Sequence, residues 1–306
     1  QSVHLRDRAV LTNFFQRFRS RIPSASTITL VHAAHAGATC LFQDKKTMNM
    51  IMEEVTRRGI ANERLKDLER LVFALMTFNY PKTHPLYDMI AEQLVNPARE
   101  NEIKKFSHTF SCALMYLSMA NCYPLEIITK IMDHEYIRKV YKNNAFRVGR
   151  EYLALECGLK IEVPEYKGAF LPERIYNYIA KKHAADAVWR EDPSQRVQTY
   201  QKFLFEVTHY LKQIVGEKNY YIDQVLPHYR RADIILCLDR EDKFVEPQPM
   251  LDALPTFHIK PAPHGYKWFA LVLATFNHTF YASSEMTGPT CAKFRQLEIL
   301  GYKPIT

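Results

Sequence analysis

The chain has 306 residues, of which 47% are hydrophobic and 24% are charged, and its formal net charge at pH 7 is +8. These values are ordinary for a globular protein and exclude a disordered chain, while the length allows two or more domains. The sequence contains no apolar run of about 18 residues, so we expect no membrane span. The positive charge is compatible with a partner that carries phosphate groups.

The six cysteines are dispersed, and none forms a C-x-x-C pair or lies beside a histidine at zinc-ligand spacing. His32 and His35 share one face of a predicted helix, but no third metal ligand lies near them in the sequence. Most of the cysteines lie in apolar runs, as small buried side chains do. We therefore expect a reducing compartment, no metal site and no cofactor.

Strong helix formers dominate the first half of the chain, where no glycine occurs between Gly59 and Gly149. Asn62 is the expected N-cap of one of the helices. The spacing of apolar residues predicts helices, joined by short connections, over residues 3–18, 26–36, 47–58, 62–78, 85–95, 101–119, 125–132 and 136–157.

A short internal echo occurs within this helical region. The segment A-L-M-T-F-N-Y-P at 74–81 resembles A-L-M-Y-L-S-M-A-N-C-Y-P at 113–124. The Ala-Leu-Met elements are 39 residues apart, which falls in the range of two-helix solenoid repeats. The echo favours a helical-repeat array, with an irregular all-α domain as the alternative.

The composition changes after Gly158. Residues 161–172 contain prolines and a glycine and read as a connector. Two more helices are expected at 172–183 and 197–215, the second ending at Gly216. Further on, the sequence predicts strands or short helix-to-strand units at 220–227 and 232–238, followed by a proline-rich loop at 241–265.

The last forty or so residues predict a strand, a helix and the start of another strand. Phe269 to Leu273 form an apolar run typical of a strand that is buried on both faces. Gly288 and Pro289 favour a helix start, and Gly301 is a suitable residue just beyond the helix end. Along this helix Phe294, Leu297 and Leu300 form an apolar stripe, while Lys293, Arg295 and Gln296 lie off the stripe and predict a solvated basic face.

Two stretches together resemble the FAST-kinase-domain protein family. L-A-L-E-C-G-L-K-I-E-V-P-E-Y-K-G-A-F-L-P at 153–172 looks like the hallmark of the second FAST domain. G-E-K-N-Y-Y-I-D-Q-V-L-P-H-Y at 216–229, A-D-I-I-L-C-L-D at 232–239 and the closing segment resemble the RAP domain that ends those proteins. Glu162, Glu165 and Lys167 belong to the first stretch, and we expect them to have a structural role in the connector.

The resemblance implies a mostly α fold. A helical-repeat-like array of antiparallel helix pairs would be followed by a small α/β domain of the restriction-endonuclease-like type. The implied segments are N-terminal helical hairpins at 1–63, a FAST domain 1-like region at 64–133, a FAST domain 2-like region at 134–217, and a RAP domain at 218–306 that we expect to be truncated at its C-terminus.

The resemblance also implies work on mitochondrial RNA. Members of the family act in the mitochondrial matrix on transcript processing, stability or translation. We expect single-stranded mitochondrial RNA as the partner, with RNA-processing proteins as further partners. The chain has no G-x-G-x-x-G, H-R-D or D-F-G motif, so a protein kinase is not expected. A metal-dependent endoribonuclease and a protein-interaction scaffold without RNA contact remain as alternatives.

The nuclease alternative requires carboxylates that hold Mg²⁺, in the manner of PD-(D/E)xK-like enzymes. Asp233 lies where the first ligand is expected, with Asp239 and Glu241 as weaker candidates. On the next strand the expected acidic positions are Val272 and Ala274, which are apolar. The sequence therefore favours holding RNA over cutting it, and Mg²⁺ is expected only for the nuclease.

Aromatic, amide and basic side chains around the last predicted turn suit single-stranded RNA, through base stacking and phosphate contact. The first helix and a later lysine pair add further cations, with solvated or structural roles as the alternative. The candidate RNA-binding residues are Asn277, His278, Tyr281, Lys293, Arg295, Arg17, Arg19, Arg21, Lys104 and Lys105.

Overall fold

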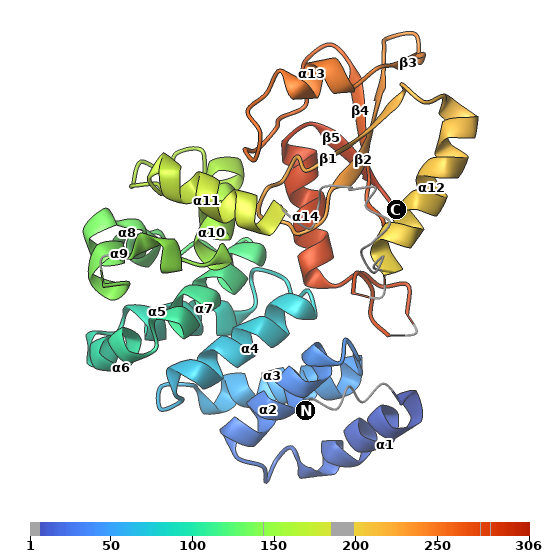
Figure 1. The fold of residues 1–306 in the computed structure, drawn as a ribbon. Coiled ribbons are helices and arrows are strands. Elements are labelled where there is room, and N and C mark those ends of the chain that lie inside the picture. Colours follow the sequence, from blue (N-terminus) through green and yellow to red (C-terminus); the bar gives the residue numbers. More distant parts are fainter. Residues whose placement is uncertain (1–6, 143, 185–198, 276, 282) are drawn as a thin grey trace. The chain divides into compact units, whose positions relative to one another are not determined.

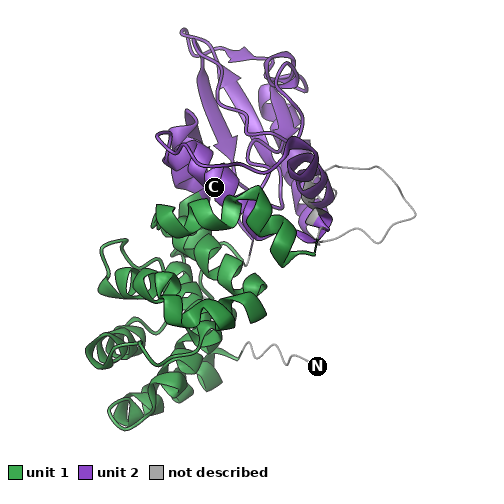
Figure 2. Cartoon of the chain, turned by 90° about the vertical axis from the view of Figure 1, so that its left-hand side faces the viewer, with its two compact units in different colours: residues 1–143, 276–292 green, residues 144–275, 293–306 purple. Residues whose placement is uncertain are grey.

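A computed structural model describes residues 7–142, 144–184, 199–275, 277–281 and 283–306. By chain contacts the molecule divides into two compact units, and neither is continuous in sequence (Figure 2). Unit 1 contains residues 1–143 and 276–292, and unit 2 contains residues 144–275 and 293–306. Within the described residues, no helix has both the length and the apolar character that crossing a membrane requires. The four segments predicted from the family resemblance stay predictions.

Unit 1 consists of helices packed around leucine side chains. Helix α4 packs against α2 and α7, and Leu30, Leu71 and Leu114 on these three helices are fully buried. The helices are α1 (Arg8–Phe18), α2 (Thr27–Thr39), α3 (Lys45–Arg58), α4 (Leu65–Thr77), α5 (Pro85–Val95), α6 (Glu100–Lys105), α7 (Ser107–Met119), α8 (Leu125–Met132) and α9 (His134–Val140) (Figure 1).

Side-chain caps define where several of these helices begin. Ser26 accepts a hydrogen bond from the backbone N–H of Thr29, and Asp44 accepts one from that of Thr47. Asp7 caps α1 in the same way, so α1 begins at Arg8, and residues 3–6 of the predicted helix lie outside the described residues. Helix α4 begins at Leu65 and not near Asn62, because the Glu102 carboxylate accepts a hydrogen bond from the free Leu65 N–H.

Two predicted helices are interrupted. The helix expected at 101–119 divides into α6 and α7, because the backbone of Phe106 leaves the helical region. The prediction of one continuous helix over 136–157 is wrong in its middle part. Helix α9 ends at Val140, and Lys142 takes a positive φ of 52°, which a continuous helix does not allow. A short 3₁₀ turn at Ala145–Arg147 and the separate helix α10 follow.

Three helices of unit 1 share one kind of ending. Leu41, Asn79 and Asn121 follow α2, α4 and α7, and all three have positive φ. In each case the next residue donates its N–H to the carbonyl five residues earlier, the pattern of a Schellman motif. The acceptors are the carbonyls of Gly37, Leu75 and Leu117. The echo at 74–81 and 113–124 therefore corresponds to a repeated helix end.

Unit 2 is built around a mixed sheet of five strands. Its order is β1-β2-β4-β5, with β3 also paired to β2, and all pairs are antiparallel except β4 with β5. The strands are β1 (Tyr220–Asp223), β2 (Asp233–Leu238), β3 (Phe244–Val245), β4 (Lys267–Leu271) and β5 (Tyr302–Ile305), and the helices are α10 (Arg150–Glu162), α11 (Glu173–Ala184), α12 (Thr199–Val215), α13 (Gln248–Asp252) and α14 (Gly288–Ile299).

Both faces of the sheet are covered. Leu204 on α12 packs with Ile234 and Leu273 on one face. Leu297 on α14 packs with Ile235 and Ala270 on the other. Figure 1 shows α12 and α14 on opposite sides of the strands. Alternating side chains of β2 therefore enter two cores, which explains its continuous apolar sequence. The loop predicted at 241–265 contains β3 and α13.

The closing segment forms the predicted strand, helix and strand. Helix α14 belongs to unit 1 over 288–292 and to unit 2 from Lys293 onward. A Cβ on Gly288 would overlap the carbonyl oxygen of Met76, so only glycine fits there. Gly301 takes the expected positive φ, 91°, and turns the chain into β5.

Candidate nucleic-acid interface

A solvent-open hollow lies along one side of α11 in unit 2. Its volume is about 670 Å³, within the range of small-molecule sites. The hollow is lined by two aromatic, two basic and two amide side chains, namely Phe146, Tyr178, Arg174, Lys181, Asn144 and Asn177. Four of these residues are spaced i, i+3, i+4 and i+7 on α11, so they share one face of the helix.

The aromatic rings of the hollow are exposed and in contact. Phe146 and Tyr178 meet edge to face with ring centroids 4.9 Å apart. The guanidinium carbon of Arg174 lies 5.3 Å from the centroid of the Phe146 ring, a cation–π arrangement. The two rings keep 39% and 42% of their surface exposed. Large exposed rings of this kind are the surfaces on which unpaired bases stack.

The polar groups of the hollow have few partners of their own. Neither Arg174 nor Lys181 forms an ion pair with a residue that the structure describes, and the Asn177 amide has no hydrogen-bond partner among those residues. Two cations and an amide with donor and acceptor atoms therefore face solvent beside two rings. This combination suits a ligand with phosphate groups and flat polar rings.

Unit 1 carries a cluster of exposed cations. Lys104 forms an ion pair with Glu100 at 2.8 Å. This contact, aided by the nearby Lys130 and Lys139, holds the pKa of the Glu100 carboxyl below its ordinary value. A second hollow of about 390 Å³ is lined by residues of α9 that include Arg138 and Lys139. The cluster can attract a polyanion.

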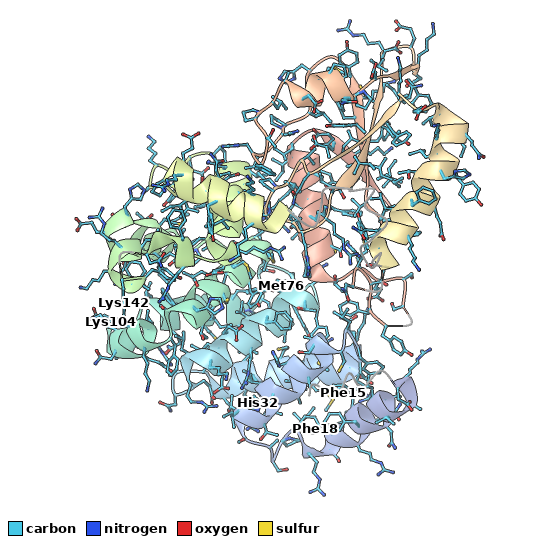
Figure 3. The ribbon with its side chains drawn as sticks, viewed as in Figure 1. Phe15, Phe18, His32, Met76, Lys104 and Lys142 are labelled. Atoms are coloured by element: carbon cyan, nitrogen blue, oxygen red, sulfur yellow. The ribbon has the colours of Figure 1, made fainter. Side chains whose placement is uncertain are left out.

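The predicted candidates of this region are exposed. Lys104 and Lys105 both face solvent, and Lys105 lies over the ring of Phe106 with its nitrogen 5.4 Å from the centroid. Figure 3 shows Lys104 and Lys142 on the same side of the view. Within the part of the chain that the structure describes, Lys142 has no ion-pair partner. These lysines are accessible to a phosphate.

The arginines predicted around the first helix differ in their surroundings. Arg17 and Arg21 are exposed. Arg19 instead binds both carboxylate oxygens of Asp44 at 2.8 and 2.7 Å, so its guanidinium already has an anionic partner. Phe18 stacks on Phe14 with centroids 5.8 Å apart (Figure 3 labels Phe18). Arg17 and Arg21 remain available, whereas Arg19 joins α1 to α3.

The predicted turn residues lie in unit 1. Asn277 and Tyr281 are exposed, and His278 is half-buried, with its carbonyl accepting a hydrogen bond from the Thr287 N–H. The backbone N–H of Tyr281 donates to Leu41 at 2.7 Å, which anchors the turn on the helices of this unit.

Lys293 and Arg295 belong to unit 2, and the prediction of a solvated basic face there is wrong. Lys293 keeps only 5% of its surface exposed, and its ammonium group lies 2.5 Å from the Asp233 carboxylate. Arg295 donates two hydrogen bonds to Glu162, each 3.2 Å long. Gln296 is also buried and donates to Glu162 at 2.7 Å. Each of these polar groups has a partner inside the unit.

The carboxylates predicted for a nuclease have structural partners too. Burial raises the pKa of Asp233, and the Lys293 ammonium offsets part of this rise. Asp239 accepts hydrogen bonds from the backbone N–H groups of Glu241 and Lys243, so it stabilises a turn. Glu241 is exposed.

A second acid, which the sequence did not indicate, lies beside Asp233. Asp223 is its direct partner across β1 and β2, so both side chains lie on the same face of the sheet. Asp223 is paired with the buried Lys260 at 2.7 Å. Val272, at the position expected for an acid, is buried in the apolar core. Each of the two aspartates thus has its own lysine.

The hallmark stretch at 153–172 makes structural contacts. The buried Glu156 accepts hydrogen bonds from Lys160 at 2.6 Å and from the backbone N–H of Leu171 at 2.7 Å. Lys160 also lies over the rings of Phe170 and Tyr176, 5.0 Å from each centroid. These contacts fasten the connector to α10 and α11.

Most of the chain is similar to known proteins. Residues 153–246 match the family model of the FAST kinase-like protein, subdomain 2. A stretch of 241 residues, 77% of this chain, is 25% identical to the mouse (Mus musculus) protein named FAST kinase domain-containing protein 5, mitochondrial, and covers 30% of that protein. The Macaca fascicularis and Homo sapiens proteins of that name are 21% and 22% identical over 72% of this chain. No solved structure gives a significant match.

The predicted resemblance is thus confirmed for the second FAST subdomain and for homology to these relatives. The chain spans less than a third of their length. All four matching relatives are named as mitochondrial proteins, which confirms the mitochondrial location. None of the residues that line the hollow on α11 is among the RNA-binding candidates predicted from the sequence. The sequence did not indicate a binding role for Phe146 or Tyr178, because each lies in a segment whose pattern predicts a helix.

Proposed function

We propose that this protein binds single-stranded RNA in the mitochondrial matrix and acts there in the processing, stability or translation of transcripts, with RNA-processing proteins as further partners. The observation that carries the proposal is the hollow on α11, in which two exposed rings lie beside cations without ion-pair partners among the described residues. Bases of single-stranded RNA stack on such rings in a sequence-tolerant way, while cations contact the phosphates.

The helices of unit 1 contribute a second contact. We propose that they form a helical-repeat array of antiparallel pairs, a proposal supported by the common ending of α2, α4 and α7. The exposed cations around Glu100, which include Lys104, would hold the phosphate backbone. Lys105 and, at the first helix, Arg17 and Arg21 are further candidates. The sheet of unit 2, with helices on both faces, is compatible with a RAP domain.

Binding is favoured over hydrolysis. In a PD-(D/E)xK-like nuclease the carboxylates need open coordination positions for Mg²⁺. Asp233 is 2% exposed and Asp223 is also mostly covered, and each is bound to a buried lysine. An interaction scaffold without RNA contact is less well supported, because it leaves the cations and rings of the hollow without a role.

The binding proposal is tested with a labelled single-stranded RNA and a duplex of the same sequence, titrated by fluorescence anisotropy. We expect the single strand to bind more tightly. The double variant Phe146→Ala/Tyr178→Ala should weaken binding by roughly 5- to 100-fold, since stacking contributes about 1–3 kcal/mol per base. Tyr210→Ala is the matched control, because Tyr210 is an exposed ring on α12 of the same unit.

Three outcomes would contradict the proposal. Absence of binding at low salt would leave the scaffold alternative. Equal losses in the double variant and in the Tyr210→Ala control would remove the hollow from the interface. Cleavage of the RNA in the presence of Mg²⁺, abolished by Asp233→Ala, would establish the nuclease.

A further inference from the structure

The order of side chains along α11 suggests more than general affinity for RNA. We propose that the hollow is a subsite for one unpaired purine base, held between its two flanking phosphates and read at its edge by an amide. This inference rests on the proposed RNA binding and gives it a base preference at one position.

The first argument is the arrangement of charge along the helix. Arg174 and Lys181 are seven residues apart, which corresponds to about 10 Å along the helix axis. Asn177 and Tyr178 lie between them on the same face. A nucleotide within a strand has this pattern, because a phosphate on each side flanks the base. The cations therefore define two phosphate positions, and the ring defines the base position between them.

The second argument is the surface on which the base would stack. Phe146 meets Tyr178 edge to face, so the two rings form a corner and not a parallel slot. Arg174 lies over the Phe146 ring, which keeps the guanidinium beside the corner. A base can thus lie flat on one exposed ring while its edge meets other groups. A purine has the larger ring system and gains more contact area on such a surface than a pyrimidine.

The third argument is the amide at the centre of the site. Asn177 is half-buried, and its side chain has no hydrogen-bond partner among the described residues. An amide presents one acceptor oxygen and two N–H donors, which match the adjacent donor and acceptor atoms of a base edge. The amide faces solvent in the hollow, so a base with a matching edge exchanges the amide's hydrogen bonds to water for direct ones, whereas a base with a mismatched edge leaves polar groups unpaired. Asn144, which also lines the hollow, offers a second amide.

The inference is tested with oligouridylates that contain, at one central position, adenine, uracil or an abasic site. The full chain should bind the adenine-containing strand more tightly than the other two, by roughly 5- to 100-fold for a well-placed amide and stacked ring. A strand with 2-aminopurine at the central position should lose fluorescence on binding, because stacking quenches it.

Variants separate the parts of the site. Tyr178→Ala should remove the difference between the adenine and abasic strands and restore the 2-aminopurine fluorescence. Asn177→Ala should reduce the preference for adenine over uracil but retain the quenching. Lys181→Ala should reduce the affinity for all three strands by the same factor, as expected for a phosphate contact. Tyr210→Ala removes an exposed ring of the same unit that lies outside the hollow, and it should keep the preference for adenine and the quenching of the unaltered protein.

The outcomes distinguish this inference from the proposed function. Equal affinity for the adenine, uracil and abasic strands, with RNA still bound, would overturn the base subsite and leave RNA binding intact. Failure of the unaltered chain to bind any of the strands at low salt would overturn both.

Discussion

Lys293 and Asp233 form an ion pair in the interior of unit 2, where both side chains are shielded from water. Removing one member of such a pair leaves the other charge without compensation, which costs about 3–5 kcal/mol. A phosphate that approached Lys293 would have to displace Asp233 and enter the core. The ammonium group therefore contributes to the fold of the unit and is not available to RNA in this conformation.

His228 predicts how the stability of unit 2 depends on pH. Burial lowers the pKa of His228 to about 3, and the nearby Arg150 and Lys293 lower it further, whereas a hydrogen bond with Gln296 opposes the shift. In the unfolded chain the pKa is near 6.5. Between these values only the unfolded state takes up the proton, so stability is retained above pH 6.5 and falls as the pH decreases toward 3.

Between pH 7 and pH 5 the contribution of His228 should lower the free energy of unfolding by about 2 kcal/mol. The measurement is urea unfolding followed by tryptophan fluorescence, compared with His228→Gln, which keeps a hydrogen-bonding group but does not titrate. The variant should show a smaller loss over the same interval. Identical pH dependence in the two proteins would mean that His228 is hydrated or protonated in the folded state.

At the level of helices and strands, local signals in the sequence were sufficient to predict most elements. The helix at 288–299 was anticipated from Gly288 and Gly301, and β1, β2 and β4 from their apolar runs, whereas β3 lies in the segment predicted as a loop. The burial of Lys293 could not be anticipated, because its partner lies 60 residues earlier and no local pattern connects them. A charged residue outside the apolar stripe of a helix is exposed to solvent only when no oppositely charged residue packs against it.

The hollow on α11 could not be predicted from local sequence patterns either. Phe146 was expected inside a helix at 136–157, and it is brought to Tyr178 only because that helix is interrupted after Val140. The sequence indicated only two of the three repeated helix ends. Asn79 and Asn121 occur in the echo, whereas Leu41 has the same backbone without the amide that favours it.

Gly288 provides a test at the level of one helix. Gly288→Ala would place a methyl group on the Met76 carbonyl, and backbone atoms cannot move aside as a flexible side chain can. We expect unit 1 to lose about 1–3 kcal/mol, the usual cost of overpacking. Thermal unfolding measures the loss, with Pro289→Ala as the control in the same helical turn. An unchanged melting temperature would mean that the α14 start does not pack against α4 in solution.

For the whole molecule, the net charge of +8 predicts that RNA affinity falls steeply with salt. Replacing Lys130 and Lys139 by alanine should reduce the slope of log affinity against log salt by roughly 0.7 for each phosphate that the variant no longer binds. The control replaces Lys46 and Lys66, which are also exposed in unit 1, and makes the same change in net charge. The comparison is made by anisotropy titration across a salt series. Equal slopes in the two double variants would indicate that the effect is one of net charge alone.

The division of α14 between the two units has a consequence for biosynthesis. Unit 1 needs residues 276–292, and unit 2 needs residues 293–306, which include β5. A chain that emerges from the ribosome in sequence order therefore cannot complete its first unit before nearly all of the second has been made. Helices α1 to α9 therefore lack their contacts with residues 276–292 while unit 2 is translated. Residues 276–306 then complete both units together, so we expect nascent chains that stop before residue 276 to depend most on chaperones.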